Sequence, residues 1–195
     1  MKTVIIKYNA GNVQSVMYAL DRIGACYEWT DDPDTIRTAD KVIFPGVGEA
    51  STAMAYLRQR GLDTFIPTLR QPVLGTCVGM QLMCRYSEEN DTTCMGIFDV
   101  DVIRFPRMEG FKVPQTGWND IYNYQTPLCK GLREHDYVYY NHSYYAPLCE
   151  DTVANTNYIV EYSAMLQKDN FYAAQFHSEI SGNVGQQIFE NFLQL

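Results

Sequence analysis

The sequence predicts an α/β fold of three layers, with a mostly parallel central sheet flanked by helices and an antiparallel extension. Two observations support this fold class. Up to residue 83, short β-branched apolar runs alternate with segments whose apolar residues recur at helical spacing, a pattern typical of parallel sheets with right-handed crossovers. After Met95 the pattern changes to period-two alternation and to a region rich in Tyr, Pro and Asn, which favours antiparallel strands and loops.

The first half should contain four strands separated by helices. Each expected strand is a short run that ends at turn-forming residues, and each expected helix carries apolar residues three or four positions apart. The strands are predicted at residues 3–6, 25–30, 41–44 and 73–76. The helices are predicted at residues 13–23, 31–40, 50–60, 62–70 and from 78 onward. Gly24 stands at the position of a C-terminal cap, and Pro72 follows the end of the fourth helix.

The second half is expected to add a half-exposed strand, a hairpin and a closing helix. Residues 97–102 alternate with period two, and the segments 163–167 and 171–176 flank the turn-forming Lys168-Asp169-Asn170. Apolar residues at helical spacing between residues 184 and 192 mark the last helix. Because no repeat, low-complexity segment or linker interrupts the chain, residues 1–195 are expected to form a single domain.

Composition and charge exclude several classes of protein. The chain has 15 Lys and Arg against 23 Asp and Glu, and its net charge of −8 disfavours nucleic acid as a partner. A hydrophobic content of 46% excludes intrinsic disorder. No run approaches the roughly 20 apolar residues that span a bilayer, and Lys7 interrupts the opening segment, so we expect a cytoplasmic protein without membrane contact. The six cysteines are far apart and contain no C-x-x-C pair, which predicts reduced, mostly buried thiols.

Gly75-Thr76-Cys77-Val78-Gly79 is a candidate nucleophile elbow in its thiol version. It follows a predicted buried strand and opens a predicted helix, whose N-terminus carries partial positive charge that stabilises a thiolate. The alternative is a buried cysteine between two glycines that let the helix pack against the sheet. The position at a strand-to-helix junction favours catalysis.

A cysteine nucleophile needs a base, and the chain offers His135, His142 and His177. His177 follows the predicted strand 171–176, and in an extended chain residues two apart share a face, which places Glu179 beside it. Glu179 would then fix the imidazole tautomer and stabilise its protonated form, as the third member of a triad. The alternative is a structural histidine, but the nearby carboxylate and the elbow cysteine together favour catalysis.

Two further segments are candidates for substrate contacts. Pro45-Gly46-Val47-Gly48 ends a predicted parallel strand, where α/β sheets place their ligands, and its backbone N–H groups together with that of Val78 suit a developing oxyanion. An ordinary glycine turn or a weak phosphate loop explains it almost as well, although no G-x-G-x-x-G follows the first strand. Asn141-His142-Ser143-Tyr144-Tyr145 bunches polar groups and rings, yet composition alone favours a structural role. Composition also favours a solvated helix end for Glu88-Glu89.

Two motifs together are more specific than either alone. Gly75-Thr76-Cys77-Val78-Gly79-Met80-Gln81-Leu82, followed by Phe176-His177-Ser178-Glu179, resembles the class I (triad) glutamine amidotransferases over essentially the whole chain. Within that class, further segments resemble the glutaminase subunits of imidazole glycerol phosphate synthase, from histidine biosynthesis. These segments are Tyr8-Asn9-Ala10-Gly11-Asn12, Phe44-Pro45-Gly46-Val47-Gly48, Gly117-Trp118-Asn119 and Asn141-His142-Ser143-Tyr144-Tyr145.

The resemblance implies that the chain hydrolyses glutamine without a metal or organic cofactor. It makes Cys77 the nucleophile, His177 the acid and base, and Glu179 the partner that orients His177. It places the backbone N–H groups of Val47 and Val78 at the oxyanion hole. It also implies a glutamine pocket lined by Gly48, Gln81, Glu89, His142, Ser143 and Tyr144.

The resemblance further implies a heterodimer with a cyclase subunit of (β/α)₈ barrel form, which uses the ammonia to make imidazole glycerol phosphate and aminoimidazole-carboxamide ribotide. The chain is too short to contain that barrel. One alternative is a glutaminase of the same class that serves a pyridoxal phosphate or anthranilate synthase. A second alternative is a regulatory module without activity, against which the presence of all three triad residues argues.

The sequence departs from the family pattern at several positions. His177-Ser178-Glu179-Ile180-Ser181 stands where H-P-E-K-S is common, so the proline and a lysine associated with docking the partner are missing. Gln115-Thr116 replaces the histidine and methionine of P-H-M-G-W-N, and Val78 replaces a leucine, a benign change because a backbone N–H is what that position supplies. We therefore expect the partner to be held by apolar contacts around Trp118 and by the turn 9–12.

Overall fold

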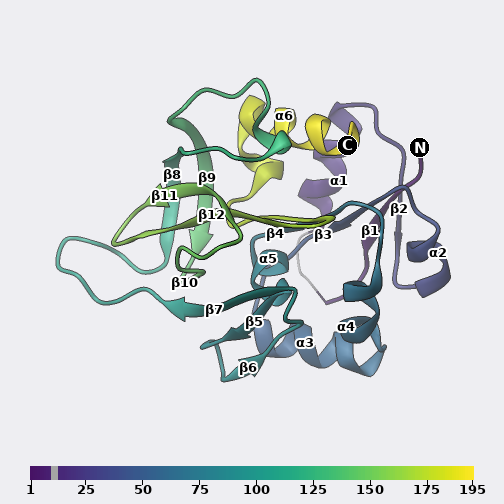
Figure 1. Cartoon of the computed structure of the whole chain (residues 1–195), viewed down its shortest axis with the longest axis horizontal. Helices are drawn as coiled ribbons and strands as arrows, with labels where there is room; N and C mark the ends of the chain where they lie inside the picture. Colours follow the sequence, from purple (N-terminus) through teal and green to yellow (C-terminus); the bar gives the residue numbers. More distant parts are fainter. Residues whose placement is uncertain (10–12) are drawn as a thin grey trace.

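The computed structural model describes residues 1–9 and 13–195, so residues 10–12 of the predicted turn lie outside the described residues. Its central sheet is built from β1 (Thr3–Ile6), β2 (Tyr27–Thr30), β3 (Lys41–Phe44), β4 (Val73–Thr76), β11 (Thr152–Asn157), β12 (Glu161–Lys168) and β13 (Phe171–Ala174). The strand order is β11-β12-β13-β4-β3-β1-β2 (Figure 1). The strands from β2 to β13 run parallel, and β12 and β11 add an antiparallel edge.

Helices cover both faces of this sheet (Figure 1). One face carries α1 (Gln14–Arg22) and α6 (Gly182–Leu193), and the other carries α3 (Ala50–Gln59), α4 (Leu62–Phe65) and α5 (Val78–Met83). Alternate residues of β1 enter the two cores, since Val4 and Ile6 pack with the α3 side and Ile5 packs with the α1 side. Burial on both faces explains why the inner strands β1 and β3 are almost uniformly apolar, whereas the edge strand β2 is not. The predicted three-layer fold class is confirmed.

Two smaller sheets extend the second half of the chain. The first contains β5 (Cys84–Ser87), β6 (Thr92–Thr93), β7 (Phe98–Arg104) and β10 (Tyr144–Tyr145), in the order β10-β7-β5-β6. The second pairs β8 (Gln115–Ile121) with β9 (Asp136–His142) in antiparallel register. The predicted hairpin is also present, since β12 and β13 pair up to Lys168 opposite Phe171.

Two helix predictions differ from the structure. The expected helix over 62–70 is a single turn, α4, followed by the 3₁₀ turn η1 (Ile66–Thr68), because Pro67 lacks the N–H that would continue the helix. The helix after Cys77 ends at Met83, and β5 follows because Cys84 pairs with Phe98 on β7. The prediction that Glu88-Glu89 ends a helix is therefore wrong, since both residues follow a strand.

The remaining connections include α2 (Pro33–Arg37), η2 (Pro127–Cys129) and η3 (Ser178–Ile180). All six cysteines are free thiols, and four of them are buried. Over residues 1–9 and 13–195 no helix has the length and apolarity that a membrane crossing requires.

The sheet brings three loops together at one edge. Strands β3, β4 and β13 are parallel neighbours, so their C-terminal ends meet. The segment 45–48 follows β3, Cys77 follows β4, and His177 lies three residues after the end of β13. The carboxyl edge of a parallel sheet is where α/β proteins bind their ligands.

Candidate active site

Cys77 lies in a strained turn between β4 and α5. Its φ of 51° and ψ of −113° place a residue with a side chain in a region that glycine normally occupies. The flanking glycines allow the backbone to approach closely. A Cβ on Gly79 would clash with the carbonyl of Phe44, and a Cβ on Gly46 would clash with the N–H of Gly79. The predicted elbow is therefore held by contact between α5 and the loop after β3.

His177 and Glu179 are in direct contact behind this turn. The His177 Nδ1 lies 2.7 Å from Glu179 Oε1, and both side chains are buried. The contact does not arise from an extended strand, as the sequence suggested, because Glu179 lies in the 3₁₀ turn η3. Ser181 fixes the backbone of that turn, accepting from the N–H of Tyr139 at 2.9 Å and donating to the carbonyl of His177 at 2.6 Å.

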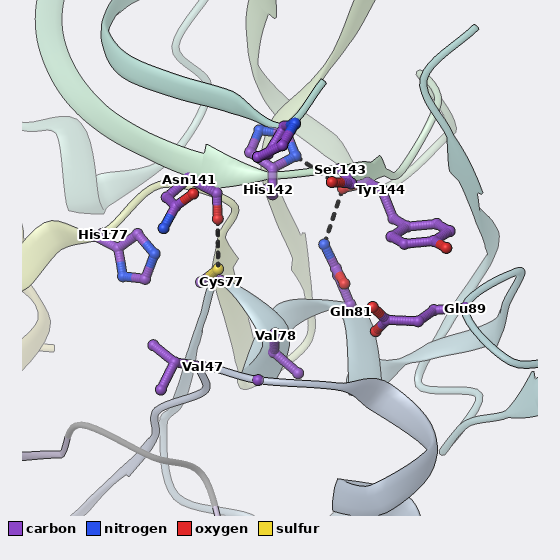
Figure 2. A pocket seen from close by; sticks show the side chains of 12 residues that line it. Val47, Cys77, Val78, Gln81, Glu89, Asn141, His142, Ser143, Tyr144 and His177 are labelled. Carbon is purple, nitrogen blue, oxygen red and sulfur yellow. Dashed lines mark hydrogen bonds between the residues drawn. The ribbon is translucent and has the colours of Figure 1, made fainter. Parts of the chain in front are cut away.

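The surroundings of His177 favour its protonated form. Burial alone lowers its pKa, but the sulfur of Cys77 and the carboxylate of Glu179 raise it more strongly, so that the pKa rises to about 11. Because Nδ1 donates a hydrogen bond to Glu179, Nε2 is the ring nitrogen that can interact with the sulfur of Cys77. Figure 2 shows the imidazole beside Cys77 at one end of the pocket.

The other two histidines cannot serve as the base. His142 is buried, and burial lowers its pKa to about 4, so the ring is neutral at pH 7. Its Nδ1 donates to the carbonyl of Tyr144 at 2.8 Å, and its Nε2 lies 3.1 Å from the hydroxyl of Tyr162. His135 is largely exposed and contacts Asp120 on the surface.

A pocket of about 280 Å³ opens over Cys77, near the lower end of the range for small-molecule sites, roughly 300 Å³. It is lined by Val47, Gly48, Cys77, Val78, Gln81, Glu89, Pro114, Asn141, His142, Ser143, Tyr144 and His177 (Figure 2). The structure therefore brings together every residue that the sequence assigned to the nucleophile, the base, the oxyanion hole and the glutamine pocket. Glu179 lies behind His177, outside this lining.

The two expected oxyanion donors do not both face the pocket. The N–H of Val78 donates to the carbonyl of Gly46 at 3.3 Å. In a trans peptide the carbonyl and the next N–H point in opposite directions, so the N–H of Val47 points away from Val78. Gly48, with a φ of 105°, follows this peptide. The expected pair of donors could face the pocket together only if the peptide between Gly46 and Val47 rotated.

The far end of the pocket is polar. Glu89 is half-buried, which raises its pKa, and one of its oxygens accepts from the N–H of Ala50 at 2.8 Å, at the start of α3. The amide of Gln81 donates to the carbonyl of Tyr144 at 2.9 Å. Its oxygen is directed toward Glu89 in Figure 2. This end of the pocket therefore offers acceptors to a ligand that carries an ammonium group.

Two contacts of the sulfur were not predicted: one with Gln175, and one with the backbone of Asn141, which belongs to a segment that the sequence had singled out. The carbonyl of Asn141 lies 4.0 Å from Cys77 Sγ, and the Nε2 of Gln175 lies 3.9 Å from it. Gln175 is an amide in an otherwise apolar and aromatic segment before His177, and that contrast is the signal that could have identified it. Gln115, at the departure from the family pattern, contacts the Tyr162 hydroxyl at 2.8 Å behind the pocket wall.

Comparison with known proteins places the chain in a family. The model of the glutamine amidotransferase class-I family matches residues 4–195. The chain is 56% identical to the imidazole glycerol phosphate synthase subunit HisH of Bacteroides fragilis strain YCH46 and 54% identical to that of Bacteroides thetaiotaomicron. Each alignment covers 100% of this chain and 100% of the relative. A solved glutamine amidotransferase from Thermotoga maritima shares the fold, with a TM-score of 0.65 and 14% identity over 100% of this chain and 83% of that chain. The chain belongs to the class-I glutamine amidotransferases and, within them, to the HisH subunits of imidazole glycerol phosphate synthase.

Proposed function

We propose that residues 1–195 act as one glutaminase domain that hydrolyses glutamine and delivers ammonia to a cyclase subunit of (β/α)₈ barrel form, in a one-to-one cytoplasmic heterodimer. The observation that carries this proposal is the buried cluster of Cys77, His177 and Glu179 at the end of a polar pocket. The family membership supports the reaction and the partner. The proposed chemistry uses no metal or organic cofactor.

The reaction follows from the positions of the three side chains. The thiolate of Cys77 attacks the side-chain amide carbon of glutamine, and a tetrahedral intermediate forms. His177 donates its proton to the amide nitrogen, the C–N bond breaks, and ammonia leaves a thioester on Cys77. The neutral His177 then takes a proton from water, whose oxygen attacks the thioester. The C–S bond breaks, and glutamic acid departs and ionises in water. The regenerated Cys77 thiolate and the proton that remains on His177 restore the starting ion pair.

The electrostatics of His177 suit both steps. Its pKa of about 11 depends partly on the negative sulfur of Cys77. When the C–S bond forms, that charge moves to the substrate oxygen, so the imidazolium becomes a stronger acid as the amide nitrogen requires a proton. Glu179 stays charged and holds Nδ1–H, which keeps the other nitrogen directed at the reacting atoms.

Glutamine fits the pocket with its amide at Cys77 and its amino acid end at Glu89. The carboxylate of Glu89 and the amide oxygen of Gln81 would accept from the α-ammonium group. Gly48, His142, Ser143 and Tyr144 complete the walls around the side chain. A neutral His142 suits such a wall, since a charged one would repel the ammonium.

The loop after β3 provides a switch between slow and fast states. In the observed conformation the carbonyl of Gly46 accepts from the N–H of Val78, so that donor is engaged. Rotation of the peptide between Gly46 and Val47 would free it and add the N–H of Val47. One oxyanion donor changes the rate by roughly 10² to 10³. We infer that the partner stabilises the rotated peptide, so ammonia forms only when its acceptor is ready.

An exposed surface beside the triad suits the cyclase. A small pocket of about 170 Å³ is lined by Val47, Tyr139, His177, Glu179 and Ile180, among others, and it adjoins the substrate pocket at His177. Trp118, 56% exposed, packs edge-on against Tyr139. Ile180, in place of the family's lysine, is 44% exposed. We infer that the barrel docks on this surface through apolar contacts and receives ammonia from it.

Co-expression with the cyclase of the same genome tests this function. We expect the two chains to co-purify, and glutamine with the cyclase substrate to yield both glutamate and imidazole glycerol phosphate. A chain that hydrolyses glutamine but binds a different synthase would contradict the assignment of the partner. A chain that binds the cyclase without glutamine hydrolysis would contradict the assignment of the reaction.

A further inference from the structure

A buried amide, Gln175, lies between the nucleophile and the glutamine pocket. It follows β13 and precedes His177 by two residues, and its side chain is inaccessible to solvent. Its Oε1 accepts from Gln81 Nε2 at 3.1 Å, and its Nε2 lies 3.9 Å from Cys77 Sγ. Its backbone N–H donates to the carbonyl of Ala164 on β12 at 2.9 Å, which anchors it to the sheet.

The neighbours of Gln175 fix the direction of its amide. The carbonyl of Tyr144 accepts hydrogen bonds and cannot donate, so the group of Gln81 that faces it is the NH₂ group. The second N–H of that group points at Gln175, which must therefore present its oxygen. The NH₂ group of Gln175 is then the group that faces the sulfur of Cys77.

We propose that Gln175 is a further residue of the glutaminase site, which donates a hydrogen bond to the Cys77 thiolate and couples it to the substrate pocket through Gln81. This inference rests on the proposed role of Cys77 as the nucleophile. The donor fixes the sulfur between His177 and the pocket. It also stabilises the thiolate again when the thioester breaks and sulfur is the leaving group.

The groups around the sulfur make this donor selective for the thiolate. The carbonyl of Asn141, at 4.0 Å, can accept only from a protonated thiol. Tyr8 and Tyr162 are the tyrosines whose charge would affect Cys77, and burial raises the pKa of both, so they stay neutral. The charge that faces the sulfur is that of His177. Gln175 therefore adds a neutral donor that persists whichever protonation state His177 adopts.

The test is the pH dependence of Cys77 alkylation by iodoacetamide in the complex with the cyclase, measured by mass spectrometry of the peptide that contains Cys77. Gln175→Met keeps the side-chain length but removes the donor. We expect the midpoint of the profile to move to higher pH, with alkylation about fivefold slower on the acidic limb and unchanged at the alkaline limit. The matched control Gln167→Met makes the same change on β12, and the profile should stay that of the parent.

Cys26 and Cys84 report on folding in the same digest. Cys26 is exposed and Cys84 is buried, so a folded variant labels the first and spares the second. If Cys84 is alkylated in Gln175→Met, that variant is not correctly folded, and Gln175→Asn is used in its place. Asparagine keeps a buried amide but draws the N–H back from the sulfur, so its profile should show the same shift. A folded variant with an unshifted profile overturns the proposal. Since alkylation requires no glutamine, this outcome is independent of whether the chain is a glutaminase.

Discussion

Replacing Glu179 with glutamine tests the separate contributions of Glu179 and His177 to the rate of glutamine hydrolysis. The carboxylate holds Nδ1–H of His177 at 2.7 Å in a buried site, and its second oxygen has no hydrogen-bond partner within residues 1–9 and 13–195. Glu179→Gln can keep the acceptor but removes the charge. A hydrogen bond to a charged group contributes about 1.5–3 kcal/mol, so we expect kcat to fall roughly 10- to 150-fold. His177→Ala should cost far more, because that side chain moves the protons.

The same substitution has a signed effect on the pH profile. The pKa of His177 is raised to about 11, so its protonated form persists until the pH rises through that value. Without the charge of Glu179 the pKa falls, by about 1–2 units for 1.5–3 kcal/mol. The alkaline limb of kcat/KM for the complex, measured between pH 6 and 11, should therefore move to lower pH. An unchanged alkaline limb, or a loss equal to that of His177→Ala, would refute the assigned roles.

Three further predictions follow from the site and its surroundings. Cys77→Ala should abolish glutamine hydrolysis yet still bind the cyclase. A glutamine-analogue electrophile should label Cys77 and leave Cys84 unmodified, because burial raises the pKa of the Cys84 thiol. Mass spectrometry locates the label, and label on Cys84 would contradict the mechanism. Gly79→Ala should lower the free energy of unfolding by about 1–3 kcal/mol, since its Cβ would meet backbone, and an unchanged denaturant midpoint would speak against that packing. Trp118→Ala should weaken cyclase binding, measured by calorimetry, at least tenfold. The control Trp29→Ala, on the edge strand β2, should leave the affinity unchanged. Equal losses of affinity in the two variants would place the docking surface elsewhere.

The sequence predicts the fold class well, and the candidate site residues lie around one pocket, because both depend on local patterns. Continuous apolar runs indicate strands that are buried on both faces, and glycines around Cys77 indicate a tight junction between strand and helix. The contact between His177 and Glu179 was expected for a different local reason, since a 3₁₀ turn and not a strand brings them together. Short separation in the chain was enough to bring the two groups into reach.

Features that depend on distant contacts were not predictable in the same way. The helix ends before Cys84 because the strand β5 begins there and pairs with β7. That partner strand is too distant in the sequence for a local pattern to reveal it. Gln175 meets Cys77 only because β13 and β4 are neighbours in the sheet. The orientation of the peptide after Gly46 is also invisible in the sequence, because glycine permits either orientation and the contact with Val78 selects one.

Steady-state glutamate production by the chain alone, with the cyclase, and with the cyclase and its substrate tests whether the loop after β3 switches glutamine hydrolysis on. The observed contact between the Gly46 carbonyl and the Val78 N–H predicts slow hydrolysis by the chain alone. With the cyclase and its substrate the rate should rise on the order of a hundredfold or more, because the rotation frees the N–H of Val78 and adds that of Val47, and one oxyanion donor alone provides roughly 10² to 10³. Full activity of the chain alone would contradict the proposed switch, and no activity in any of the three mixtures would contradict the proposed glutaminase reaction.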